Sequence, residues 1–370
     1  MKYLLVISAV TVLLMFIISC QKESKSYKII RKNNVEYIIN KNSRIDDDNI
    51  VKVNKVKSIS GYDEKRESIC NFTASYLFKV DTKGNLFIYD KQYSTIKVYN
   101  DKGLYQNSIS RLGKGPTENE NFITFYIYKD TVQIIDNFLK IKKFGIDGEY
   151  YYTKTLESRL LFDNIIQCND STILASYKSF YKKDNKVHIS NNLKILNNNF
   201  KEKKTISKEE YSYESMPYND FFKENIFSVR EDIIYLSHRS KSEYKIECYD
   251  LKGELIKVIS KNFLKSKYSN QELDLIKKDQ PNNPYFKKFY DYKISLYDLH
   301  IDDNGYIWVE RNSGLFNKNI EFDIFNSKGV FIKKFIFPSK NDEILFNFSN
   351  EKIYILNTAE NLIDVYNYKY

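Results

Sequence analysis

Short stretches in which apolar and polar residues alternate, separated by tight turns, run through most of the chain. The clearest is 79–113, KVDTKGNLFIYDKQYSTIKVYNDKGLYQNSISRLG. Alternation of this kind sends successive side chains to opposite faces of a β-strand. Gly84 and Gly103 supply the positive φ that the turns of such hairpins need. The stretch therefore predicts a unit of four antiparallel strands.

This four-stranded unit recurs. Its third strand and the turn that follows reappear at 140–150, 244–255 and 320–331. The turn glycines of the four copies are Gly103, Gly148, Gly253 and Gly329. A period of about 45–50 residues with four strands per unit is typical of the blades of a β-propeller. A helical repeat is excluded because the apolar period is two almost everywhere.

The repeat predicts an all-β fold, a six-bladed β-propeller spanning 49–370. Five blades are expected at about 76–110, 122–156, 163–207, 223–260 and 296–337. The last stretch, 343–370, holds only three strands, and the N-terminal strand 49–60 is suited to close the sixth blade. Residues 27–40 are expected to add an extra strand or to cover a sheet edge.

Two long connections interrupt the repeat. Residues 208–222 are expected to form an aromatic-rich loop, and 261–295 a small, partly helical insertion between blades four and five, with its helix ending before Pro281. Both join an outer strand to the next inner strand, so they are expected on one face of the ring. Arg111–Glu118 and Arg239–Glu243 are expected on the same face.

The N-terminus carries an export signal. One lysine precedes an apolar run, and Ile17-Ile18-Ser19-Cys20 resembles the lipobox of bacterial lipoproteins. Residues 1–19 are therefore interpreted as a signal peptide, Cys20 as the lipidated residue, and 20–48 as a tether or extra strand. The membrane, reached through the lipid anchor, is the expected partner. No Asp follows Cys20, which favours the outer membrane; the periplasmic and cell-surface orientations both stay open.

One motif is more specific than blade patterning. Arg111-Leu-Gly113-Lys-Gly115-Pro116-Thr-Glu118 resembles the R-x-G-x-G-P-x-E stretch of the six-bladed, NHL/TolB-like β-propeller lipoproteins of Bacteroidota. The resemblance implies the architecture of the mature chain. It implies no activity, because most members of that family have none established.

Composition and charge exclude several classes of protein. A hydrophobic content of 42% and a charged content of 29% exclude a disordered chain and a polytopic membrane protein. The net charge of +10 comes from lysines spread over the outer strands, where they discourage edge-to-edge association, so nucleic acid is not an expected partner. Cys70, Cys168 and Cys248 cannot all pair and form no CxxC motif, so neither a disulfide framework nor a zinc site is expected.

Candidate chemistry is sparse. His188, His238 and His300 fall in different blades at no spacing that makes a metal pair or a catalytic dyad, and only His238 is expected near the loop-rich face. Asp302-Asp303-Asn304-Gly305 is interpreted as a turn. No catalytic residue, metal ligand or cofactor is predicted.

The candidate ligand-binding residues are the aromatic residues of the 208–222 loop and the charged residues of the same face. They are Tyr211, Tyr213, Tyr218, Phe221, Phe222, Arg111, Glu118 and Arg239. Exposed aromatics stack on sugars or anchor a protein partner, but they can equally pack a loop onto its own fold, and Arg111 and Glu118 can form an internal pair. The function expected is that of a monomeric, non-catalytic scaffold that binds a protein or carbohydrate. The alternative is a propeller hydrolase or lyase with a metal in the central channel.

Overall fold

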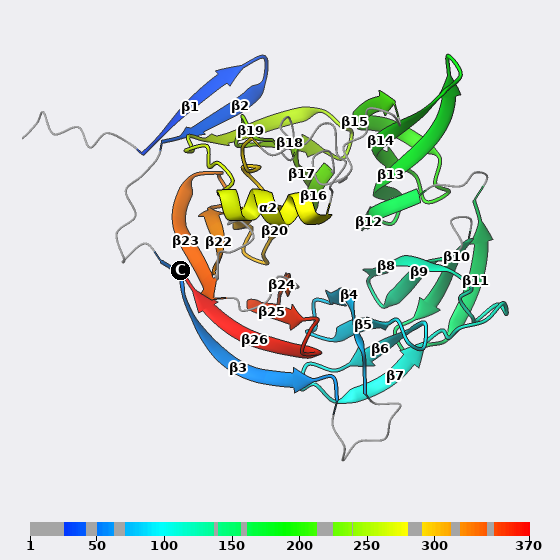
Figure 1. Cartoon of the computed structure of the whole chain (residues 1–370). Coiled ribbons are helices and arrows are strands. Elements are labelled where there is room, and N and C mark those ends of the chain that lie inside the picture. The colour runs from blue at the N-terminus through cyan, green and yellow to red at the C-terminus, as the bar shows by residue number, and fades with distance from the viewer. Residues whose placement is uncertain are drawn as a thin grey trace, which may run out of the picture.

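The computed structural model describes residues 26–41, 50–62, 71–136, 140–156, 161–212, 225–238, 240–279, 291–311, 319–338 and 344–370. Six β-sheets follow one another around a ring (Figure 1). The innermost strand of each sheet neighbours that of the next, and the innermost strand of the last sheet neighbours that of the first. The chain is therefore a six-bladed β-propeller. Residues 1–25, which include Cys20, and residues 42–49 lie outside the described part, so the anchoring interpretation is not addressed by it.

The first three blades are each formed by four consecutive strands. Blade one consists of β4 (Ala74–Val80), β5 (Leu86–Asp90), β6 (Thr95–Tyr99) and β7 (Tyr105–Ile109). Blade two consists of β8 (Phe122–Tyr128), β9 (Thr131–Asp136), β10 (Lys140–Gly145) and β11 (Tyr150–Thr155). Blade three consists of β12 (Leu161–Asn169), β13 (Thr172–Lys183), β14 (Lys186–Leu196) and β15 (Glu202–Ser212).

The last three blades involve both termini. Blade four consists of β16 (Asn225–Arg230), β17 (Ile233–His238), β18 (Lys245–Asp250) and β19 (Leu255–Lys261). Blade five consists of β20 (Asp298–Ile301), β21 (Ile307–Arg311), β22 (Asn319–Phe325) and β23 (Phe331–Pro338). Blade six consists of β24 (Ile344–Ser349), β25 (Lys352–Asn357), β26 (Leu362–Lys369) and the N-terminal strand β3 (Lys52–Ser60). β3 pairs antiparallel with β26 along its whole length.

The apolar core is divided among the blade interfaces. Each of six apolar clusters of described residues draws its members from two adjacent blades. In β5, Leu86 and Ile88 pack toward blade six, whereas Phe87 and Tyr89 pack toward blade two. The alternating sequence therefore buries both faces of an inner strand, one against each neighbouring blade.

A hairpin near the N-terminus extends blade four. β1 (Tyr27–Lys32) and β2 (Val35–Asn40) are joined by Asn33 and Asn34, both with positive φ, as a two-residue hairpin turn requires. β2 pairs parallel with β19, so the blade becomes a six-stranded sheet. The buried Asn40 side chain donates to the carbonyl oxygens of Ser260 and Gly329. This side chain therefore ties the hairpin to blades four and five together.

The insertion between blades four and five contains the helix α2 (Asn270–Asp279), which ends before Pro281 as the sequence predicted. Ser269 and Glu272 form a reciprocal cap at its start: the N–H of Ser269 donates to Glu272, and the N–H of Glu272 donates to the Ser269 hydroxyl. Within the described residues, no helix has the length and apolar character needed to cross a membrane.

The loop expected at 208–222 begins later than the sequence suggested. β15 continues to Ser212, where it pairs with His188 of the long strand β14. The expectation that 208–212 belong to a loop is therefore wrong. The extended β13–β14 hairpin supplies backbone partners that a blade of standard length would not have.

Candidate functional site

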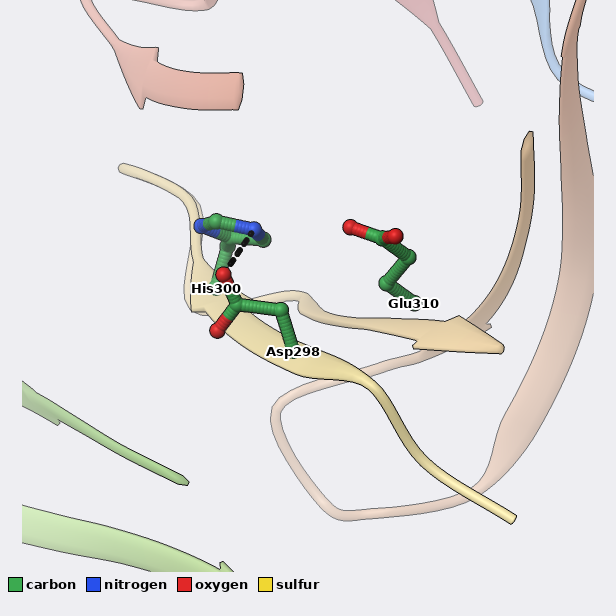
Figure 2. A group of neighbouring side chains, drawn as sticks. All are labelled: Asp298, His300 and Glu310. Atoms are coloured by element: carbon green, nitrogen blue, oxygen red, sulfur yellow. Dashed lines mark ion pairs between the residues drawn. The ribbon is translucent and has the colours of Figure 1, made fainter. Parts of the chain in front are cut away.

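The two innermost strands of blade five bring three potential metal ligands together. Asp298 and His300 are two residues apart on β20, so their side chains lie on the same face of the strand. Glu310 of β21 is the direct cross-strand partner of Asp298. One ligand atom from each residue lies within 4.8 Å of the other two (Figure 2). The turn 302–305 sets the register of this hairpin and thereby the group.

Aromatic side chains hold the imidazole of His300 in place. The centroid of its ring lies 5.1 Å from that of Phe348 on β24 and 6.3 Å from that of Phe322 on β22. Burial lowers the pKa of His300 below 6.5, so the neutral imidazole is favoured. Asp298 is half exposed, with its Oδ2 atom 3.5 Å from Nε2 of His300. The group thus combines a fixed nitrogen donor with a carboxylate open to solvent.

The sequence did not reveal this group. It singled out His238, at the end of β17, as the histidine nearest a functional position. Two features of the sequence carried the signal. Asp298 and His300 are two residues apart, and the hairpin turn that follows makes Glu310 the cross-strand partner of Asp298. Recognising it required the strand register as well as the spacing of the histidines.

Arg111 and Glu118 form a pair within the connection between blades one and two. The Nε atom of Arg111 donates to Oε1 of Glu118 at 3.0 Å, and the N–H of Gly115 donates to Oε2 at 2.9 Å. The N–H of Gly115 and then the Arg111 guanidinium hold the pKa of Glu118 below its ordinary value. Lys142 of blade two donates to the carbonyl oxygens of Gly115 and Glu118. These contacts agree with one of the two alternatives from the sequence, an internal pair between Arg111 and Glu118. They do not test whether the two residues also bind a ligand.

Of the aromatic candidates for ligand binding, only Tyr211 lies among the described residues. Tyr211 lies in β15, paired with Ile189 of β14. The remaining candidates lie outside the described residues; they are Tyr213, Tyr218, Phe221, Phe222 and Arg239.

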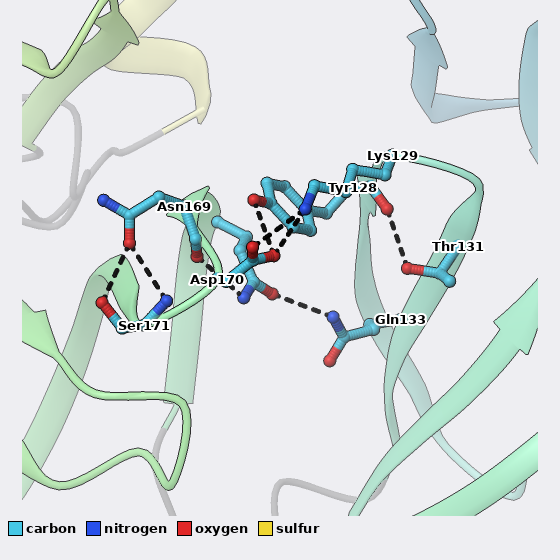
Figure 3. Close-up of polar contacts among 8 residues, drawn as sticks. Tyr128, Lys129, Thr131, Gln133, Asn169, Asp170 and Ser171 are labelled. Atoms are coloured by element: carbon cyan, nitrogen blue, oxygen red, sulfur yellow. Dashed lines mark hydrogen bonds and ion pairs between the residues drawn. The ribbon is translucent and has the colours of Figure 1, made fainter.

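Polar contacts between the β8–β9 turn and the β12–β13 turn, beside the innermost strands, join blades two and three (Figure 3). Asp170 accepts hydrogen bonds from the hydroxyl of Tyr128 at 3.0 Å and from the ammonium of Lys129 at 2.7 Å. Deeper in the interface, the amide of Gln133 donates to Gln167 at 3.0 Å. Exposed pairs of this kind contribute at most about 1 kcal/mol to stability. We interpret them as contacts between blades.

An open hollow of about 630 Å³ lies between the β1–β2 hairpin and blade four. Arg31, Lys32 and Lys257 contribute cationic groups to its lining, and Glu36 pairs with Arg31 at 3.1 Å. The charged groups that line the hollow are therefore mainly basic.

No protein-family profile and no curated protein sequence matches this chain. Several solved structures are similar at low identity. The WD40 domain of Neurospora crassa Pan2 aligns with a TM-score of 0.46 and 10% identity, covering 88% of this chain and 97% of that one. BamB from Moraxella catarrhalis aligns with a TM-score of 0.36 and 11% identity, covering 94% and 95%. Neither TM-score reaches 0.5, and nothing about partners or activity is transferred from these proteins.

Proposed function

We propose that this protein is a monomeric, lipid-anchored lipoprotein of the outer membrane whose six-bladed propeller is a non-catalytic scaffold for a protein or carbohydrate ligand. The anchor is Cys20, and the ligand binds at the face that carries the insertion between blades four and five. Similarity of the Arg111–Glu118 segment to NHL/TolB-like lipoproteins of Bacteroidota supports the assignment.

The insertion is the observation that carries the binding role. Its helix is fixed to the returning chain by an ion pair between Glu272 and Lys293, 2.9 Å apart and almost fully buried. Leu264 and Leu275 nevertheless face solvent, with 82% and 41% of their surface exposed. Apolar side chains displayed on a fixed element commonly anchor a partner.

The hairpin β1–β2 supports the anchoring role. Six residues separate Cys20 from Tyr27, the first residue of β1, and a chain of that length spans at most about 25 Å. A lipid on Cys20 would therefore keep β1 close to the bilayer. β1 presents Lys28, Ile29 and Ile30 to solvent, a basic and apolar mixture suited to a membrane surface.

Anchoring is tested by Cys20→Ala in the full-length chain, with Cys168→Ala as the matched control. We expect the Cys20 variant to lose incorporation of labelled fatty acid and to leave the detergent phase in phase partitioning. The Cys168 variant should behave like the wild type. Equal partitioning of the Cys20 variant and the wild type would show that the lipobox interpretation is wrong.

Ligand binding is tested with Leu264→Asp, compared with Leu104→Asp. Leu104 is also exposed, but it lies in the connection between β6 and β7, at the other end of the strands from the insertion. We expect the Leu264 variant alone to lose binding to a glycan on an array or to a partner crosslinked in intact cells, by at least about tenfold. Equal losses in both variants would contradict the assigned face.

A propeller hydrolase or lyase is the second candidate, favoured by the Asp298, His300 and Glu310 group. All three donors come from blade five, and within the described residues no other blade contributes to the group. Hydrolase and lyase assays with added divalent ions, on wild type and His300→Ala, distinguish the candidates. Metal-dependent turnover that the variant lacks would displace the scaffold proposal.

A further inference from the structure

His300 contains a nitrogen atom whose hydrogen-bonding capacity is unused within the described chain. Its Nε2 atom has no exposed surface and no hydrogen-bond partner there. A buried polar atom left without a hydrogen bond destabilises the folded chain. Because the contacts with Phe348 and Phe322 fix the ring, the atom is also held in one direction.

The same nitrogen faces two carboxylates. Oδ2 of Asp298 lies 3.5 Å from Nε2, and the carboxylate of Glu310 is directed toward the imidazole from the neighbouring strand (Figure 2). Like charges at directly facing positions of a sheet repel each other. A cation between Asp298 and Glu310 would replace repulsion by attraction and would satisfy Nε2 as well.

We propose that Asp298, His300 and Glu310 bind one divalent transition-metal cation of the Zn²⁺ class, with Nε2 of His300 as the nitrogen ligand. Bonds of about 2.0–2.2 Å in a tetrahedral site place neighbouring ligand atoms about 3.4 Å apart. The distance between Nε2 and Oδ2 already meets this requirement. All three ligand atoms lie within 4.8 Å of one another, so side-chain shifts of at most roughly 1.4 Å would close the site.

The donor set selects the class of metal. A nitrogen and two carboxylates suit Zn²⁺ and its neighbours, whereas Ca²⁺ takes six to eight oxygens and Mg²⁺ retains much of its water.

Three protein ligands leave one tetrahedral position for a water molecule or an external ligand. Half of the Asp298 side chain is exposed, which gives the ion a route from solvent. The site lies on the two innermost strands of blade five and includes no residue of the lipid anchor or of the insertion. It is therefore independent of the proposed scaffold function.

The test is a calorimetric titration of the full-length protein in detergent, stripped of metal with a chelator, with Zn²⁺ as the probe. We expect one tight site in the wild type, a higher melting temperature with Zn²⁺, and visible d–d absorption when Co²⁺ is bound instead. Asp298→Asn and Glu310→Gln keep side-chain shape and should each weaken binding by at least about tenfold. His300→Ala should abolish it.

The matched control is His188→Ala, since His188 stacks on Tyr181 in blade three, away from the site. This variant should bind Zn²⁺ like the wild type. No tight binding, or equal binding by the wild type and all three site variants, would overturn the proposal. Ca²⁺ or Mg²⁺ binding as tight as that of Zn²⁺ would overturn the assigned class. If His300→Ala fails to fold, the Zn²⁺ binding of Asp298→Asn and Glu310→Gln decides whether the proposal holds.

Discussion

Single residues in the connection between blades one and two explain the sequence motif Arg111–Glu118. Gly113 has a φ of +150°, and a Cβ atom there would lie 2.1 Å from Oε2 of Glu118. The glycine therefore leaves room for the carboxylate that Arg111 and the N–H of Gly115 bind. In physical terms, the motif is a means of holding Glu118 inside its own loop.

Gly113→Ala should destabilise the fold by about 1–3 kcal/mol, because it adds backbone strain and displaces Glu118. Gly115→Ala is the matched control: its φ is not in the positive region and the nearest atom would lie at 3.0 Å. We expect a smaller loss there, measured by urea denaturation. Equal stability of Gly113→Ala and the wild type would show that the loop tolerates a moved Glu118.

Asp302 is a second decisive residue, because one buried carboxylate links blade five to the C-terminal strand. It accepts hydrogen bonds from Trp308 Nε1 at 2.9 Å, from the hydroxyl of Tyr368 at 2.9 Å and from the hydroxyl of Tyr370. Burial and then Asp302 raise the pKa of Tyr368, which keeps this hydroxyl protonated as a donor.

Asp302→Ala should lower the free energy of unfolding by about 3 kcal/mol or more, since it leaves several buried donors without an acceptor. Asp81→Ala is the control. Asp81 occupies the same turn in blade one and accepts the N–H groups of Lys83 and Asn85, but among the described residues it accepts no hydrogen bond from an aromatic side chain. Its loss should cost about 1 kcal/mol in the same urea experiment. Similar losses at both positions would show that the aromatic network adds nothing.

Among the elements, α2 depends on one acidic residue for both its start and its position. Glu272 completes the cap with Ser269 and pairs with Lys293. Glu272→Ala should cost about 3–5 kcal/mol, because Lys293 would remain buried without its partner. Asp274→Ala, on the exposed side of the same helix, is the control and should cost less than about 0.5 kcal/mol. Hydrogen exchange should rise across α2 in the first variant only; unchanged exchange would contradict this role.

The strands and their order could be predicted from sequence because alternation and turn chemistry are local. The six blades and the helix before Pro281 follow from such patterns. Partners from distant strands could not be predicted. Lys97 stands at a position that the alternation of apolar and polar residues predicts to be exposed. Its side chain is nevertheless almost fully buried, with Nζ 3.1 Å from Oδ2 of Asp90. His300 gained Glu310 as a neighbour in the same way, through the register of β20 and β21, which the spacing of Asp298 and His300 does not encode.

At the scale of the whole molecule, the N-terminal segment has two separable roles. The hairpin β1–β2 extends blade four at its outer edge, whereas β3 forms the outer edge of blade six (Figure 1). Val51 and Ile59, just before and within β3, are buried in the two apolar clusters on either side of blade six. The N–H of Val51 also donates to the carbonyl oxygen of Lys334 in blade five.

Deleting residues 21–60 should therefore destabilise the entire ring, because it bares the edge of β26 and opens two blade interfaces at once. Deleting 21–41 keeps β3 and removes only the hairpin, so we expect a smaller loss, confined to blade four and its contact with blade five. Thermal melting of both variants beside the mature chain measures the difference. A protein lacking 21–60 that melts like one lacking 21–41 would show that β3 contributes nothing to ring stability. Because the blades form a closed ring, the loss at blade six should appear as one cooperative transition at lower temperature, with aggregation, and not as a separate early step.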